Sequence, residues 1–175
     1  MIEAWHFVCD DRKLRDGTPL EIGKRLVHDG PLVLCQSGYH ASEKILDALQ
    51  YAPGSVACRV QCDGDILRDT DKLVCRERTA IWALDATAVL RAFTRRCALD
   101  VIHLWDAPQV VRDYLTTGDE SLRAAARAAA WAAARDAARA DARDAASAAA
   151  SADAWARYEL WLVEMVTEAH TKEAT

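Results

Sequence analysis

The chain has 175 residues, a formal net charge of −5, and hydrophobic residues at 51% of its positions. This length is enough to bury the core of one domain, with or without an appendage. The acidic balance argues against non-specific nucleic-acid binding, which requires a cationic surface. No uncharged run is long enough to cross a bilayer, and the first residues lack a basic leader. We therefore expect a soluble, cytoplasmic protein that does not associate with membranes.

The first half of the chain alternates short apolar runs with turn residues, and it predicts a small α+β domain over residues 1–84. Strands are expected at residues 2–9, which should lie centrally in the sheet, at 32–35 and at 55–62. A further strand is expected from residue 73 to residue 82, interrupted by the charged residues 76–78. Three successive charges in a strand indicate either an exposed edge or bulge, or a charged group presented to a cleft.

A turn at Gly38–Ser42 joins the 32–35 strand to the principal helix expected in this half. Gly38 supplies the turn, and Ser42 is placed as an N-cap whose hydroxyl accepts from the first amides of the helix. The apolar residues at 45, 46 and 49 share one helical face, and a Pro-Gly pair at 53–54 ends the helix. The start of such a helix offers amides and a positive dipole to an anion.

Six cysteines are scattered through the chain, and we expect them to be reduced and mostly buried. In a strand at 55–62, alternation would place Val56, Cys58, Val60 and Cys62 on one face, as a core requires. The paired spacings of a zinc site are missing, so no metal site is predicted. A nucleophilic pair of Cys35 and His40 is a further possibility that the sequence leaves open.

Composition changes at Asp85, and residues 85–175 predict a helical region. Asp85 can cap its first helix, Pro108 suits the first turn of a later helix, and Gly118 can end that helix. Asp119 can then cap the segment that follows. A last amphipathic helix should place a set of large apolar residues on one face that docks onto other helices or a partner: Trp155, Tyr158, Leu162 and Met165.

Residues 121–156 approach a tetrapeptide repeat, in which Arg, Ser or Trp recurs at every fourth position between alanines. Alanine is the best helix former, so a long helix is predicted over this range. A step of four residues winds the large side chains slowly around the helix and leaves alanine-rich faces that allow close helix packing. We expect either a hairpin broken near residues 147–153 or a homodimer. Five arginines stand against four aspartates, which argues against a nucleic-acid arm.

Several segments of the first half are similar to those of a small, functionally uncharacterised domain that is common in phage and prophage genes. They are Trp5-His6-Phe7, Cys35 with Gly38-Tyr39-His40-Ala41-Ser42, Asp47-Ala48-Leu49-Gln50-Tyr51-Ala52, and Asp71-Lys72 before Glu77-Arg78. The segment Leu104-Trp105-Asp106-Ala107-Pro108 and the alanine repeat resemble extensions carried by such phage proteins. The resemblance implies an accessory protein of a phage or other mobile element, and it does not imply a chemistry.

The order of parts is also similar to that of the ADP-ribosyltransferase fold. That family places a His or Arg on an early strand, a Ser or Thr where a strand meets a helix, and a Glu on a later strand. In this chain the three positions would be filled by His6, Ser42 and Glu77, which the resemblance implies as catalytic residues with NAD as cofactor. A glutamate suits this chemistry because it can orient the nucleophile against an oxocarbenium-like centre.

Common nucleotide-binding, metalloprotease and hydrolase motifs are missing from the chain. The favoured hypothesis is therefore a non-enzymatic protein, without cofactor, that binds a host protein complex and acts as an anti-defence, anti-CRISPR-like inhibitor. Tyr39, His40, Arg76 and Arg78 are its candidate binding residues around the turn. The alternatives are the NAD-dependent transferase and a structural protein that oligomerises through the alanine-rich helix.

Overall fold

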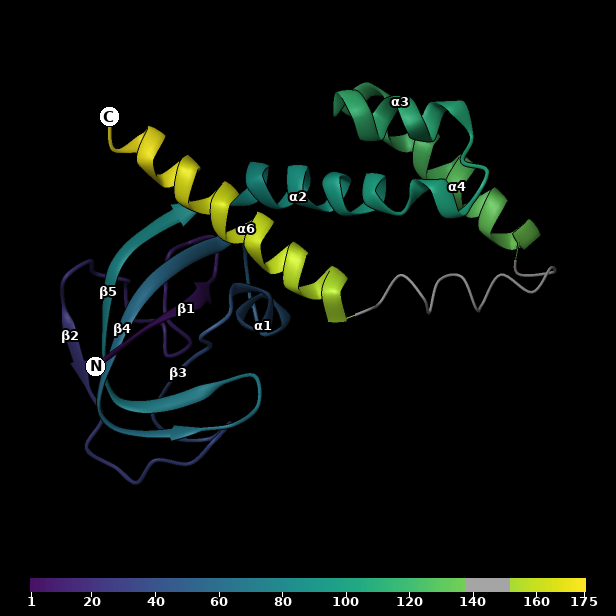
Figure 1. Ribbon diagram of the computed structural model, residues 1–175. Coiled ribbons are helices and arrows are strands. Elements are labelled where there is room, and N and C mark those ends of the chain that lie inside the picture. Colours follow the sequence, from purple (N-terminus) through teal and green to yellow (C-terminus); the bar gives the residue numbers. More distant parts are fainter. Residues whose placement is uncertain (138–151) are drawn as a thin grey trace. The chain divides into compact units, whose positions relative to one another are not determined.

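The computed structural model describes residues 1–137 and 152–175, with side chains at residues 1–133 and 153–175 (Figure 1). The chain clusters into two compact units. Unit 1 comprises Met1–Leu90 together with Glu159–Thr175, and unit 2 comprises Arg91–Tyr158. These limits differ from the domains expected at 1–84 and 85–175, and that division stays a prediction. No described helix is both long and apolar enough to cross a membrane.

Unit 1 is built on an antiparallel sheet of five strands, and with its helices it confirms the predicted α+β class. The main path of the sheet runs in the order β1-β4-β5-β2, and β3 pairs with β5 beside this path. The strands are β1 (Ile2–Val8), β2 (Arg25–Val27), β3 (Tyr39–Ala41), β4 (Val56–Arg68) and β5 (Leu73–Asp85).

The first strand lies at the end of this path, so its predicted central position is wrong. Its apolar character on both faces has another cause. Trp5 and Ser42 form a bridge with two backbone hydrogen bonds of 2.7 and 2.9 Å, which joins the free side of β1 to the residue after β3. Because β3 also pairs with β5, the sheet curls back toward its own first strand and encloses an inner face.

The strand predicted at residues 32–35 is also wrong. Val33 and Ser37 form an isolated bridge around a tight turn, in which Cys35 has a positive φ of 64°. The strand begins only at Tyr39, inside the segment predicted as a turn. Gly38 has a φ of +105°, and a Cβ there would lie 2.5 Å from Val74 Cγ2. Glycine is therefore required both by backbone conformation and by the close approach of β5.

The principal helix of the first half, α1 (Ile45–Gln50), does not use Ser42 as its cap. Its N-cap position is Lys44, which makes no side-chain cap hydrogen bond. The amides of Ile45 and Leu46 instead donate to the two carboxylate oxygens of Glu159, at 2.7 and 2.9 Å. The cap comes from a helix more than a hundred residues later, which no local pattern could indicate.

The charged residues 76–78 lie in the interior of β5, where Glu77 and Arg78 pair with β4 on one side and β2 on the other. Of the alternatives that the sequence left open, the exposed edge is therefore excluded. The β4–β5 pairing does shift register between Asp63 and Ile66, opposite this triplet. Gly64 takes a positive φ of 71° within that irregularity. Residues 63–65 therefore form a bulge inside one long strand.

The inner face of the curled sheet carries the main core. Val56, Cys58, Val60 and Cys62 are buried in one cluster, which confirms their predicted common face. On the other face Trp5, Arg59 and Trp82 lie opposite one another across three strands. The Trp82 ring stacks on His170 of the last helix, with centroids 4.2 Å apart, and Leu162 of the same helix is fully buried.

The remaining elements are helical: α2 (Thr87–Asp100), η1 (Ile102–Leu104), α3 (Gln109–Thr117), η2 (Glu120–Leu122), α4 (Arg123–Ala137) and α6 (Ala152–Glu173). Three sequence signals are confirmed. Asp85 Oδ1 accepts from the Thr87 amide at 3.0 Å, Gly118 ends α3 with a φ of 70°, and Asp119 accepts from the Ser121 amide at 2.9 Å. Of the predicted long helix, residues 138–151, including most of the expected break, lie outside the described residues.

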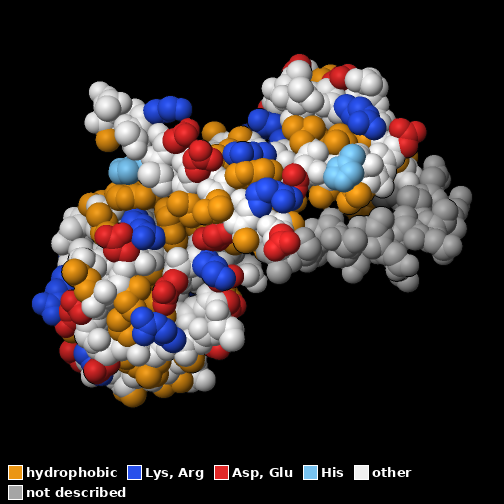
Figure 2. Space-filling model, in the orientation of Figure 1, with side chains coloured by type: hydrophobic (Ala, Val, Ile, Leu, Met, Phe, Trp, Pro, Cys, Tyr) orange, Lys and Arg blue, Asp and Glu red, His pale blue; other side chains and the backbone are white. Residues whose placement is uncertain are grey.

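Unit 2 has its own tie between helices. Asp100, the last residue of α2, accepts hydrogen bonds from Arg157 and Tyr158 at the start of α6, and the Tyr158 bond measures 3.0 Å. Phe93 meets the Tyr158 ring edge to face, with centroids 6.5 Å apart. On the face of the molecule that Figure 2 shows, acidic and basic side chains are interspersed.

Candidate functional site

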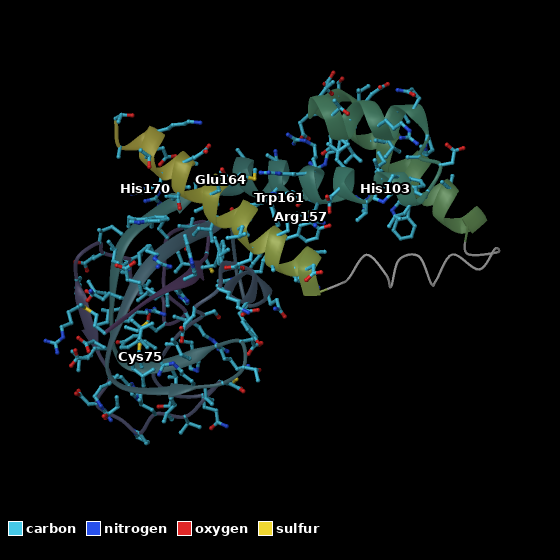
Figure 3. All side chains as sticks on the ribbon, viewed as in Figure 1. Cys75, His103, Arg157, Trp161, Glu164 and His170 are labelled. Carbon is cyan, nitrogen blue, oxygen red and sulfur yellow. The ribbon has the colours of Figure 1, made fainter. Side chains whose placement is uncertain are left out.

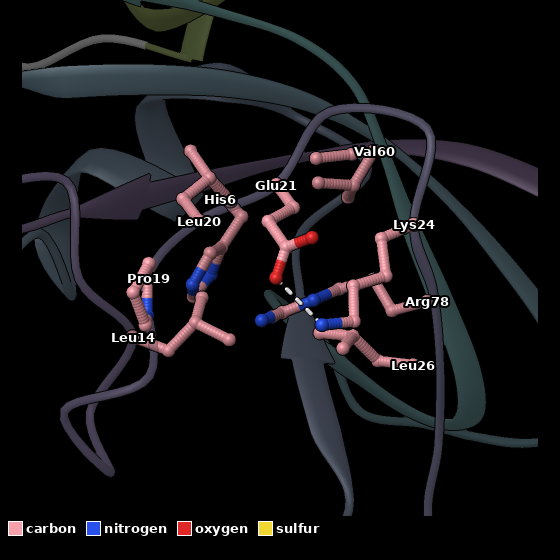
Figure 4. Close-up of a pocket in the computed structure, with 10 residues that line it drawn as sticks. His6, Leu14, Pro19, Leu20, Glu21, Lys24, Leu26, Val60 and Arg78 are labelled. Atoms are coloured by element: carbon pink, nitrogen blue, oxygen red, sulfur yellow. Dashed lines mark hydrogen bonds and ion pairs between the residues drawn. The ribbon is translucent and has the colours of Figure 1, made fainter.

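A small cavity lies in unit 1 between the sheet and the loop that follows β1 (Figure 4). His6 of β1, Val60 of β4, and Arg78 and Ala80 of β5 line its strand side. The loop contributes a second set of lining residues: Leu14, Pro19, Leu20, Glu21 and Lys24, with Leu26 of β2 beside them. The cavity measures about 10 Å³, which is the space of about one water molecule.

Arg78 is the unusual residue of this cavity because its side chain is charged and only 6% exposed. One guanidinium nitrogen donates to the His40 carbonyl at 2.6 Å, and the group lies over the Tyr39 ring, 5.2 Å from its centroid. In the described part of the chain no carboxylate forms an ion pair with it. Its charge interacts with three thiols and Tyr39, and it helps to lower the pKa of the Asp16 carboxyl. Burial accordingly lowers the pKa of Arg78.

His6 and His40 are the ionisable rings beside Arg78. Burial, followed by the Arg78 charge and then His40, lowers the pKa of His6 well below its ordinary value of 6.5. Burial also lowers the pKa of His40, whose Nε2 accepts from the Cys35 amide at 2.8 Å. Because both rings are held neutral near pH 7, Arg78 carries the charge of this cluster at that pH.

Three buried thiols surround the same guanidinium. Burial raises the pKa of Cys58 to about 11. The hydrogen bond from Cys62 lowers the pKa of Cys75, against the effect of burial, and the Cys75 thiol can donate to the Tyr39 carbonyl at 3.3 Å. Figure 3 shows Cys75 inside the curled sheet. Their burial makes these cysteines core residues. The Cys35–His40 pair has a structural explanation, because the backbone N–H of Cys35 donates to His40 Nε2.

The structure does not bring the three expected catalytic residues together. Ser42 stands opposite Trp5, and therefore on the face of the sheet away from His6. The Glu77 side chain lies on the opposite face of β5 from that of its neighbour Arg78. Its carboxylate accepts a hydrogen bond from Arg25 Nε at 2.8 Å. The cavity is also far smaller than the roughly 300 Å³ or more that ligand pockets usually offer, so it would have to open to admit NAD.

Among the expected binding residues, Tyr39, His40 and Arg78 converge with His6, whereas Arg76 does not join them. Arg76 Nε donates to Asp65 at 2.9 Å, and its Nη1 donates to the His28 carbonyl at 2.9 Å. It therefore fastens the 28–30 turn to β5. The sequence had singled out no residue of the loop at 14–24, because that loop carries no motif and reaches the cavity only through the curl of the sheet.

The residues that the structure describes include no cluster of three or more His, Cys, Asp or Glu side chains able to hold a metal ion. The cavity lining combines the buried charge of Arg78, the neutral imidazole of His6, the Glu21–Lys24 ion pair and apolar side chains. This chemistry suits binding of an anionic group by charge-assisted hydrogen bonds.

A second concave surface lies on unit 2, along η2 and the first turns of α4. This groove, of about 520 Å³, is lined by Glu120, Arg123, Ala124, Arg127, Ala128 and Trp131. Trp131 is 60% exposed. The indole is therefore a surface group and not part of a core. Arg123 forms an ion pair with Glu120 at 3.3 Å. Arg127 is the other basic side chain that lines the groove.

No curated protein matches the chain in sequence, and no solved structure matches it. Residues 2–92 match the family model described as "Domain of unknown function (DUF7666)". The matched range includes the whole sheet and every residue that lines the cavity. Because it also covers more than half of the 175 residues, the chain belongs to this family of uncharacterised domains.

Proposed function

We propose that the protein is a non-enzymatic accessory protein of a phage or prophage that binds a host protein complex and thereby inhibits a host defence. The groove on η2 and α4 makes the contact, and the observation that carries the proposal is the exposure of Trp131 beside basic side chains. Tryptophan and arginine are the residues most enriched at the energetic centres of protein interfaces.

Alanine neighbours make Trp131 effective as an anchor. Ala124 and Ala128 lie in the same groove and present no bulk, so a partner can approach the helix backbone and the indole together. Burying the exposed part of the indole would remove roughly 150 Å² from water, worth about 3–4 kcal/mol before the costs of association. This is a substantial share of the affinity of a protein complex.

The charges of the groove define the partner's chemistry. Arg123 and Arg127 stand against one carboxylate, Glu120, which leaves the groove basic although the whole chain is acidic. Figure 2 shows hydrophobic and basic side chains next to one another on the helical unit. The partner surface should therefore offer an apolar pocket with acidic residues at its rim, where opposite charge speeds encounter.

A pull-down from host lysate tests the proposal with matched tryptophan variants. Tagged wild-type protein should recover a defined host complex, and Trp131→Ala should lose it. Trp155→Ala is the control, because Trp155 is also 53% exposed and alanine-flanked but lies outside the groove. Equal recovery by Trp131→Ala and wild type, or no specific partner at all, would contradict the proposal.

Light scattering separates a host partner from a second copy of the chain. We expect the purified protein to stay monomeric at the concentrations used in the pull-down. A homodimer that Trp131→Ala converts to a monomer would assign the groove to self-association instead, and the host-binding proposal would then be dropped.

A further inference from the structure

We propose that the cavity beside Arg78 is a binding site for the carboxylate group of a small ligand with a short apolar tail. Arg78 is the principal donor, and His6 and Lys24 lie at the sides of the site (Figure 4). The lining residues fall between positions 6 and 80, and none belongs to α4. Variants of Arg78 and of Trp131 therefore test separate claims.

The first support is the unbalanced charge of Arg78. A guanidinium has five N–H donors, and in the described part of the chain the acceptor that this one reaches is the His40 carbonyl, at 2.6 Å. The side chain is 94% buried, since 6% is exposed, and it forms part of the cavity wall. Burying a charge without a counter-charge is unfavourable, and an anionic ligand would supply that counter-charge.

The second support is the chemistry of the walls. Leu14, Leu20, Leu26 and Val60 give the cavity apolar sides next to the Arg78 guanidinium. The remaining polar side chains of the lining are those of His6, Glu21 and Lys24. The planar fork of a guanidinium matches the two oxygens of a carboxylate. Phosphate is more often held by clusters of backbone amides at helix N-termini or nests, and no helix contributes to this lining. The lining therefore favours a carboxylate with a hydrocarbon tail over phosphate.

The third support concerns access. The cavity now has room for about one water molecule, so the ligand tail must displace the loop at 14–24. At its mouth Glu21 and Lys24 form an ion pair of 2.6 Å with side chains 54% and 49% exposed. Exposed ion pairs contribute little to stability, so this contact is easily exchanged. Once released from Glu21, Lys24 adds a second positive charge for the incoming carboxylate.

The test is an NMR titration of the arginine Nε–H signals with acetate, butyrate, inorganic phosphate and chloride at equal ionic strength. Butyrate should shift the Arg78 signal saturably, with half-saturation below about 10 mM, and acetate should bind more weakly because it lacks the tail. Arg59 is the control in the same spectrum. It pairs with Glu3 at 3.1 Å and lies over the Trp5 ring on the other face of the sheet.

Two outcomes of this titration would overturn the proposal. One is an Arg78 signal that shows no saturable shift up to about 100 mM butyrate, or that moves no more than the Arg59 signal. The other is tighter binding of phosphate than of butyrate, which would assign a different ligand class to the site.

Two variants make the assignment specific. Arg78→Lys keeps the charge but loses the fork, and it should weaken butyrate binding roughly tenfold or more. Lys24→Met changes an exposed side chain at the mouth, so the fold should be retained even where Arg78→Lys fails to fold. It should weaken binding several-fold, as read from the Arg78 signal. Unchanged butyrate affinity in Lys24→Met, or in a folded Arg78→Lys, would overturn the proposal.

Discussion

Glu159 and Arg78 are charged side chains of unit 1 that are partly or almost fully buried, and the fold satisfies them to different degrees. Glu159 of α6 is half-buried, and both its oxygens accept backbone amides of α1. Arg78 of β5 is more deeply buried, yet it donates to one described carbonyl and faces a cavity. A charge that the fold satisfies fully acts as a structural clamp, whereas one that is left partly unsatisfied is available to a ligand.

The two faces of the sheet differ in the same way. The face toward α6 is closed by aromatic packing, in which Trp5 meets Trp82 edge to face at 5.7 Å and Trp82 stacks on His170. The inner face holds thiols, His6 and Arg78 around a remaining space. The outer face is fully packed against α6, whereas the inner face carries the main core and also a cavity beside an incompletely satisfied charge. Substitutions on each should therefore have different signatures.

The largest effect should come from the closed face. Leu162→Ala removes a side chain with 0% exposure from α6, and it should lower the free energy of unfolding by about 3 kcal/mol. Leu160→Ala is the matched control two residues away, where the side chain is 70% exposed. It should change the free energy by less than about 0.5 kcal/mol in urea denaturation. Similar losses in both variants would show that α6 is not docked through Leu162.

Glu159→Gln should have the next largest effect. The near-isosteric amide retains one acceptor oxygen and loses the charge, so one of the two α1 amides loses its partner. We expect a loss of about 1–2 kcal/mol in the free energy of unfolding. Glu168→Gln on the same helix, in an exposed 3.9 Å pair with Lys172, should stay within about 0.5 kcal/mol. If the two variants behave alike, Glu159 does not cap α1.

Local sequence signals predicted the parts of the fold that local chemistry decides. The caps at Asp85 and Asp119, the glycine end at Gly118 and the buried alternation from Val56 to Cys62 were all found. The cap of α1 was missed because its carboxylate belongs to Glu159. The predicted 32–35 strand was wrong because these apolar residues belong to a tight turn, in which Val33 pairs with Ser37. Leu32 and Val74 both lie close to Gly38 after this turn.

The candidate site was predictable in its residue types but not in its geometry. The predicted turn at 38–42 made Tyr39 and His40 candidate binding residues. The charged residues 76–78 made Arg78 a further candidate. Whether Arg78 or Glu77 faces the inside depends on strand register and on the bulge opposite the triplet, which the sequence does not indicate. The loop that closes the cavity carries no motif, so Leu20 and Lys24 became visible only in the folded chain.

A smaller effect should appear in the pH dependence of stability. Folding lowers the pKa of His6 below its ordinary value of 6.5. Below pH 6.5, His6 therefore binds more protons in the unfolded chain than in the folded chain. The free energy of unfolding should therefore fall as the pH drops from about 6.5 toward the folded-state pKa, by at most about 1.4 kcal/mol per pH unit for this group. His40, whose pKa is also lowered, adds to the slope.

His6→Gln isolates that contribution. Denaturation curves between about pH 5 and 7 should have a shallower pH slope in the variant than in the wild type, whatever the change in absolute stability. The carboxylates whose pKa values are lowered, such as Asp85, act at lower pH and leave this window undisturbed. An identical slope in both proteins would show that His6 is not held neutral beside Arg78.

The most direct test of the contrast between the two charges is the unfolding free energy of Arg78→Met in the absence of ligand. Methionine removes a desolvation penalty of several kcal/mol, while the lost bond to the His40 carbonyl is worth about 1.5–3 kcal/mol. We therefore predict unchanged or increased stability together with loss of butyrate binding. A loss of more than about 2 kcal/mol would show instead that Arg78 is a structural cross-link.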